Sequence, residues 1–194
     1  MRSAPRRRWL VVSVAGAMAA SVAAAATPLP RYGAVPDFAV TDHTGHPLTR
    51  QMLDGVVWVA DFIFTRCAGQ CPMLSERMQR LQRAFADQSQ FRLVSFSVDP
   101  AYDTPDVLRP YAARVGAETD RWRFATGAPE AMTALIQRGF RLAVGQEGTP
   151  EEPLTHSVRL VLVDAHGAIR GYYDANDDAA MQRLVDDART LLRE

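Results

Sequence analysis

Apolar runs alternate with polar segments along this chain, and the spacing of the apolar residues distinguishes strands from helices. Residues 56–64 and 91–98 are almost continuously apolar and rich in β-branched and aromatic side chains. Such runs are typical of strands that are covered on both faces, and we expect the first of them to be central. Shorter strands are predicted at residues 37–41, 122–125, 157–163 and 168–173.

Apolar residues recur at helical spacing in the segments between these strands. One stripe with the helical period begins near Pro72, and another covers residues 181–192. The Thr-Pro pair at 104–105 supplies an N-cap and a first residue for a third helix, in which Pro110 is expected to cause a kink or an early end. A fourth helix is predicted at residues 129–138.

The order of these elements predicts the fold class. A strand arm, then strands alternating with helices, then a hairpin and a last helix are typical of an α/β sheet with an antiparallel edge. The turn-forming residues 42–47 indicate an N-terminal hairpin arm, and residues 164–167 indicate the turn of the edge hairpin. We expect one domain at residues 37–194, preceded by a proline-rich linker at 27–36.

Residues 1–26 have a composition unlike the rest of the chain. Four Arg precede an uncharged apolar stretch that ends in a run of Ala at position 26. A basic start, an apolar core and small residues at a cleavage site are the parts of an export signal. A retained N-terminal anchor is the alternative, because the apolar stretch is at the lower limit of length for crossing a bilayer. Both readings predict a domain outside the cytoplasm.

Charge and composition exclude several classes of function. The chain of 194 residues carries 22 basic and 22 acidic residues, and without the leader 18 Arg face 22 acids, a formal charge of −4. A mildly acidic domain is not a basic nucleic-acid binder. All basic residues are Arg, which excludes Schiff-base and P-loop lysine chemistry. Two cysteines are too few for a disulfide-dense scaffold or a four-thiolate metal site.

Cys67 and Cys71 are the only cysteines, and they precede the helix predicted from Pro72. A helix N-terminus stabilises a thiolate and so lowers its pKa, and the spacing separates the two sulfurs by about one helical turn. The pair could therefore bind a soft metal such as copper or close a disulfide. A static disulfide or a merely packed pair is the alternative, although a bridge over three residues would restrain the unfolded chain little.

Four histidines are candidates for a third ligand. His156 is the strongest, because it precedes a buried strand and sheet topology can bring it beside the cysteines. His43 and His46 flank a turn glycine at a spacing that permits metal binding, although such turns are usually solvated. His166 occupies a hairpin turn, and we interpret it as structural. Two thiolates and one imidazole suit copper and zinc almost equally, so the spacing leaves the metal open.

Five segments carry motifs that occur together in one known family. They are DFAVTDHTG at 37–45, FTRCAGQCPM at 64–73, SVDPAYDTP at 97–105, WRFATG at 122–127 and THSVRLVLVD at 155–164. In order and spacing these segments resemble the Sco/SenC family, over nearly all of residues 35–194. His156 lies 85 residues after Cys71, which is similar to the separation in that family.

This resemblance implies a thioredoxin-like three-layer sandwich with a central mixed sheet, and copper bound by Cys67, Cys71 and His156. The leader at residues 1–26 in turn predicts an exported protein, in the periplasm or on the outer face of the inner membrane. Its partner would be cytochrome c oxidase subunit II, with copper delivered to the CuA centre, or another exported cuproprotein, and a copper donor protein could precede it.

The chain departs from the family pattern between the cysteines. Ala68 stands where the family commonly has Pro, and an acidic residue often found there is absent. These departures concern partner choice and redox behaviour more than copper ligation. Asp99 is expected near the metal loop, either in a functional role or as a cap of the turn between strand and helix.

Three functions fit these features. The first is an exported copper metallochaperone, and the second is a thiol–disulfide oxidoreductase without obligatory metal, in which one thiolate attacks a partner disulfide and the other resolves the product. A peroxiredoxin-like peroxidase ranks third. His156 distinguishes the first two, since copper binding requires it and disulfide exchange does not. The first two are compatible, because the same sulfurs could reduce a target site and then deliver metal to it.

Overall fold

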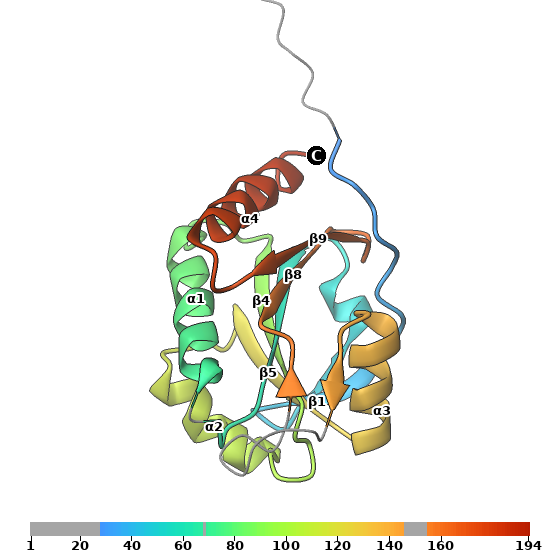
Figure 1. Ribbon diagram of the computed structural model, residues 1–194, viewed down its shortest axis with the longest axis vertical. Helices are drawn as coiled ribbons and strands as arrows, with labels where there is room; N and C mark the ends of the chain where they lie inside the picture. Colours follow the sequence, from blue (N-terminus) through green and yellow to red (C-terminus); the bar gives the residue numbers. More distant parts are fainter. Residues whose placement is uncertain (1–27, 68, 146–154) are drawn as a thin grey trace, which may run out of the picture.

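The computed structural model describes residues 28–67, 69–145 and 155–194, which form a seven-stranded mixed sheet with helices on both faces (Figure 1). The strand order is β2-β1-β5-β4-β3-β8-β9. A separate two-stranded ribbon joins β6 and β7. The strands are β1 (Ala39–Asp42), β2 (Pro47–Thr49), β3 (Val57–Ile63), β4 (Phe91–Ser97), β5 (Trp122–Thr126), β6 (Val144–Gly145), β7 (Thr155–His156), β8 (Arg159–Val163) and β9 (Ile169–Asp174).

The helices complete three layers. They are α1 (Gln70–Ala84), α2 (Pro105–Arg114), α3 (Pro129–Ala134) and α4 (Asp178–Leu191), with a 3-10 turn at Arg50–Leu53 and a π-helical turn at Leu135–Gly139. Helices α1, α2 and α4 lie on one face of the sheet, and α3 lies on the other (Figure 1). An ion pair between Arg77 and Asp178 joins α1 to α4. The predicted α/β fold with a central mixed sheet is therefore confirmed.

The centre of the sheet is parallel, and both edges are antiparallel. β3, β4 and β5 run parallel, whereas β8 pairs antiparallel with β3 and β1 pairs antiparallel with β5. Every residue of β3 is buried, as its continuous apolar run predicts. On the face covered by α3, Phe140 packs against Trp58, Phe62 and Phe96 with ring centroids 5.0 to 6.0 Å apart. The predicted hairpin arm and edge hairpin are present as β1–β2 and β8–β9.

Proline occurs in the first turn of α1, as predicted, and inside α2, where the structure differs from the prediction. α1 begins at Gln70, ahead of Pro72, and the proline is tolerated because the first amides of a helix have no intrahelical acceptor. α2 continues past Pro110 to Arg114, so the proline does not end the helix there. The helix ends where Gly116 takes a positive φ of 68°, a conformation that suits glycine.

The strand predicted at 157–163 begins two residues later in the structure, and a separate short strand precedes it. β8 begins only at Arg159, while His156 belongs to the short β7 and pairs with Val144 of β6. The chain thus joins the main sheet only after His156. Residues 146–154, which follow β6, lie outside the described residues.

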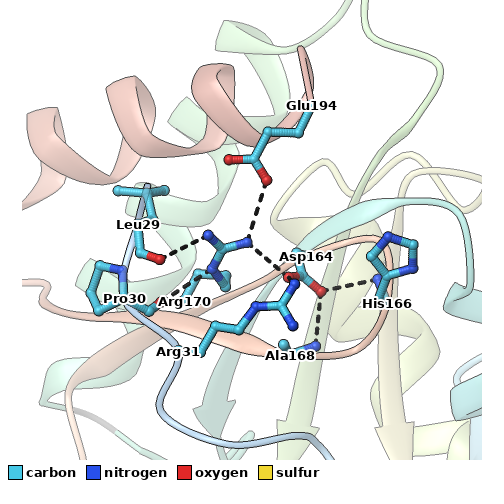
Figure 2. Close-up of polar contacts among 8 residues, drawn as sticks. All are labelled: Leu29, Pro30, Arg31, Asp164, His166, Ala168, Arg170 and Glu194. Carbon is cyan, nitrogen blue, oxygen red and sulfur yellow. Dashed lines mark hydrogen bonds and ion pairs between the residues drawn. The ribbon is translucent and has the colours of Figure 1, made fainter. Parts of the chain in front are cut away.

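The segment predicted as a linker runs along the β8–β9 hairpin (Figure 2). The buried guanidinium of Arg170 donates hydrogen bonds to the carbonyls of Leu29 and Pro30 at 2.9 and 3.1 Å. It also contacts the carboxylates of Asp164 at 2.9 Å and Glu194 at 3.5 Å. The predicted leader lies outside the described residues, among which no helix is both long and apolar enough to span a bilayer.

Candidate metal centre

The two cysteines lie where β3 gives way to α1. Cys67 is in the loop between these elements, and Cys71 is the second residue of α1. The amide of Cys71 donates a hydrogen bond to the sulfur of Cys67 at 3.3 Å. Both residues are thiols rather than the halves of a disulfide. The predicted spacing of one turn therefore brings the first sulfur to the amide end of the helix.

The environments of the two sulfurs differ. Cys67 is 9% exposed and lines a groove of about 330 Å³ between α1 and α2, whereas Cys71 is 0% exposed. Burial raises the pKa of the Cys71 thiol, and the nearby Cys67 and Asp61 add to that rise. The prediction of a lowered pKa at the helix N-terminus is thus wrong for Cys71, because desolvation outweighs the helix dipole there.

The groove beside Cys67 has a mixed polar and apolar lining. At its floor Ser75 and Tyr111 share a hydrogen bond of 2.9 Å between their hydroxyls, and burial raises the pKa of Tyr111 to about 12. The remaining lining residues are Pro72, Glu76, Gln79, Arg114 and Val115. A ligand or a polypeptide segment can reach Cys67 by this route.

The register of the sheet places the backbone of His156 at the end of β3 from which the chain runs to the cysteine loop. β8 runs antiparallel to β3 with Val161 opposite Ala60, so the chain enters β8 from the end at which β3 leaves toward Cys67. The β6–β7 ribbon, drawn as two short orange arrows, lies at that same end of the molecule (Figure 1). The imidazole of His156 lies outside the described side chains. Among the side chains that are described, no group of three His, Cys, Asp or Glu could hold a metal ion.

The other histidines lie in turns with structural contacts. His43 is buried, and its Nδ1 accepts a hydrogen bond from the amide of Phe124 at 3.2 Å; burial lowers its pKa. His46 shares a 2.8 Å hydrogen bond with the Thr44 hydroxyl. These contacts are those of an ordered turn, and His43 is not the solvated residue that its polar turn suggested. His166 lies in the β8–β9 turn, where its amide donates to Asp164 at 3.0 Å.

Asp99 lies beside the cysteine loop, as expected. Its carboxylate forms an ion pair with Arg66, the residue before Cys67, and the Arg66 guanidinium stacks 4.1 Å from the centre of the Tyr102 ring. The turn after β4 is held by the Asp99 carbonyl, which accepts hydrogen bonds from the amides of Tyr102 and Asp103. The side chain therefore contacts the cysteine loop, and the backbone of the residue holds the turn.

Two buried carboxylates near the site were not anticipated. Neither carboxylate oxygen of Asp61, in β3, has a hydrogen-bond partner of good geometry among the described residues, and burial raises the pKa of Asp61 to about 7. Asp103, in the turn before α2, accepts hydrogen bonds from Thr65 and Ser97. The sequence signalled Asp61 only by placing a charged residue within the apolar run 56–64. The second acid of the 97–105 motif was the signal for Asp103.

Comparison with known proteins identifies the family and the relatives of this chain. The family model described as SCO1/SenC matches residues 27–193. A protein of Stutzerimonas stutzeri that is named for copper binding is 31% identical over 76% of this chain and 72% of its own length.

Two solved structures share the fold. The SCO1/SenC family lipoprotein of Bacillus anthracis is 28% identical, with a TM-score of 0.75 over 82% of this chain and 95% of that one. BsSco is described as a member of the Sco family of cytochrome c oxidase assembly proteins that has a disulfide switch. It is 26% identical, with a TM-score of 0.75 over 86% of this chain and 98% of its own. The architecture is thioredoxin-like, as predicted, and the chain belongs to the SCO1/SenC family.

Proposed function

We propose that this chain is an exported metallochaperone that binds copper through Cys67, Cys71 and His156. Copper would pass from it to the CuA centre of cytochrome c oxidase subunit II, or to another exported cuproprotein. The observation that carries the proposal is the pair of thiols one helical turn apart at the start of α1, with Cys67 open to a groove. The copper-binding name of one relative and the oxidase-assembly description of BsSco support it.

Copper is the cargo of this reaction, and the donor set suits it. Thiolate sulfur is a soft ligand that selects copper, and an imidazole completes a site with one borderline donor. The Cys71 proton must leave when its sulfur binds metal, because burial keeps that thiol protonated. Cys67 borders the groove, so its sulfur is the one that a partner's ligands can approach during exchange.

The proposed location of the protein rests on the leader and on one relative. Residues 1–26 have the parts of an export signal or anchor, and residues 27–36 would connect them to the domain at 37–194. The B. anthracis relative is described as a lipoprotein, which supports an exported location for this chain. We therefore propose the periplasm or the outer face of the inner membrane.

A thiol–disulfide reductase activity is the second candidate, because the Cys71 amide lies 3.3 Å from the Cys67 sulfur and so places the two cysteines side by side at the start of α1. The Cys67 thiolate would attack a partner disulfide, forming a mixed disulfide and expelling one partner thiolate. Cys71 would then lose its proton and attack the Cys67 sulfur, releasing the second partner thiolate. The chain's two thiols are oxidised to a disulfide as the partner disulfide is reduced by two electrons.

Copper titration of the purified chain and its variants tests the metal site. Cys67→Ser, Cys71→Ser and His156→Ala should each abolish tight stoichiometric binding, measured by elemental analysis after competition with a chelator. His166→Ala is the matched control, because that histidine lies in a turn outside the site. Unchanged binding in Cys67→Ser would refute the three-ligand proposal.

The His156→Ala variant distinguishes the two candidate functions. If the chain is a metallochaperone, His156→Ala loses copper binding. If it is a reductase alone, the parent binds no copper and His156→Ala exchanges disulfides with a model peptide at nearly the parent rate. A parent chain isolated from its native compartment without copper, and with its cysteines as a reducible disulfide, would favour the reductase.

A further inference from the structure

Asp103 is a fully buried carboxylate that joins two loops of the site. It lies in the turn between β4 and α2, with 0% exposure. Its two oxygens accept hydrogen bonds from the amide of Thr65 at 3.2 and 3.3 Å, and one also accepts from the Thr65 hydroxyl. The hydroxyl of Ser97, at the end of β4, donates to it at 2.6 Å.

Thr65 is separated from Asp103 by 38 positions in the chain but lies only two residues before Cys67. The amide of Cys67 donates a hydrogen bond to the carbonyl of Phe64 at 3.2 Å, and this bond makes residues 64–67 a tight turn. A carboxylate that holds both the amide and the hydroxyl of Thr65 therefore restrains the turn at its second residue. The position of the Cys67 sulfur follows from that turn.

The alternative restraint on the loop is weaker. Arg66 pairs with Asp99, but the Arg66 side chain is 52% exposed. Exposed ion pairs contribute little, because water and salt screen them. Hydrogen bonds to a buried ionisable group contribute more, and losing one leaves a buried polar atom unsatisfied. Asp103 is therefore a stronger link than the Arg66–Asp99 pair between the loop after β4 and the loop that carries Cys67.

We propose that Asp103 is a positioning residue, whose carboxylate holds Thr65 so that the sulfur of Cys67 stays within reach of the Cys71 amide. The importance of this role for copper delivery or disulfide exchange rests on the proposed function, whereas the positioning itself does not. Without the carboxylate the 64–67 turn loses its buried anchor, and the 3.3 Å contact between amide and sulfur is no longer enforced.

The test measures the reactivity of Cys67 without any metal. In the full chain carrying Cys71→Ser, the only thiol is Cys67, and its rate of alkylation by iodoacetamide is followed by mass spectrometry. Adding Asp103→Asn should slow this reaction about tenfold, because the sulfur is no longer held where it lines the groove through which the reagent arrives. Thr65→Val should act in the same direction, and Thr65→Ser, which keeps the hydroxyl, should restore the parent rate.

Asp164→Asn is the matched control for lost stability. Asp164 is also a buried carboxylate that accepts two main-chain amides, but it lies in the β8–β9 turn near Arg170 (Figure 2). Its substitution should lower the unfolding temperature and leave the alkylation rate of Cys67 at the parent value. Equal slowing by Asp164→Asn and Asp103→Asn would overturn the proposal, because the effect would then reflect general loosening.

A double-mutant cycle tests whether Asp103 acts through Thr65. The combined Asp103→Asn and Thr65→Val variant should react about as slowly as Asp103→Asn alone, since contacting residues are not additive. A folded Asp103→Asn variant that reacts at the parent rate overturns the proposal. If Asp103→Asn does not fold, the Thr65→Val variant decides. Alkylation of Cys67 at the parent rate in Thr65→Val overturns the proposal. Slower alkylation in Thr65→Val, with the parent rate in Thr65→Ser, supports it. Absence of copper binding by the parent chain would refute the proposed function while leaving these rates interpretable.

Discussion

The main-chain amide of Cys71 donates a hydrogen bond to the sulfur of Cys67 across 3.3 Å. The sulfur of Cys71 itself lies in the interior, where burial raises the pKa of its thiol. One sulfur therefore borders a groove and receives an amide donor, while the other is enclosed and harder to ionise. The two members of the pair are unequal, and a reagent or a partner meets Cys67 first.

The unequal exposure of the two thiols predicts an order of chemical modification. In the native chain carrying Cys67→Ser, the remaining Cys71 should react with iodoacetamide at least about tenfold more slowly than Cys67 does in a Cys71→Ser chain. Mass spectrometry of timed samples measures both rates. In denatured protein the two thiols should react alike, which serves as the control. Equal native rates would mean that Cys71 is not enclosed.

Copper affinity should increase with pH. The raised pKa of Cys71 means that its thiol keeps a proton through the neutral range, and this proton must be displaced when the sulfur binds metal. Apparent affinity should therefore rise about tenfold per pH unit for each proton released. Competition with a chelator at several pH values measures the slope. Calorimetry in two buffers of different ionisation enthalpy counts the protons directly, and a slope of zero would contradict the prediction.

The local pattern of apolar and polar residues was sufficient to predict most of the fold. Neighbouring residues encode which positions are buried and whether these recur at strand or helix spacing. The apolar run at 56–64 identified an interior strand, and the stripe after Pro72 identified the helix that covers it. Pattern failed where long-range pairing decides. His156 is not part of β8, because it pairs with Val144 of β6. The spacing of apolar residues in the sequence does not reveal that pairing.

The site was partly predictable for the same reason. Cys67 and Cys71 are identified by their spacing, but the enclosure of Cys71 depends on packing that the spacing does not specify. Asp103 resembles any turn-forming acid before Thr104, and only the fold brings Thr65 to it. Asp61 is a charged residue in an apolar run, which signals an exception without revealing its surroundings.

Asp61 should make the domain less stable as the pH rises from acid to neutral. Burial raises its pKa from 3.8 to about 7. Below both values the carboxyl is protonated in the folded and unfolded chains, so it imposes no penalty. Between them only the unfolded chain ionises, so stability declines across this window and the loss is complete above the folded value. The shift corresponds to about 4 kcal/mol of unfolding free energy.

Urea unfolding at a series of pH values measures this effect. Asp61→Asn removes the titration, so the difference in unfolding free energy between this variant and the parent should change by about 4 kcal/mol across the window. Contributions of other groups cancel in that difference. Asp87→Asn, at an exposed position, is the control and should run parallel to the parent. Parallel profiles for Asp61→Asn and the parent would contradict the raised pKa.

Arg170 holds together three segments that are far apart in the chain: the segment at 29–30, the β8–β9 turn and the C-terminal Glu194 (Figure 2). Arg170→Met would leave the buried carboxylate of Asp164 without this cation and two carbonyls without their donor. Breaking a buried pair in this way should lower the free energy of unfolding by about 3 kcal/mol or more. Urea unfolding measures the loss.

Limited proteolysis gives a local measurement of the same contact. If Arg170 anchors the N-terminal segment, Arg170→Met should expose residues 29–33 to cleavage before global unfolding, because their carbonyls have lost their donor. Arg31→Met is the matched control. Its side chain is 66% exposed and approaches Asp164 only to 4.0 Å, so its removal should change stability little. Equal destabilisation by both substitutions would show that the exposed arginine, and not the buried one alone, secures the segment.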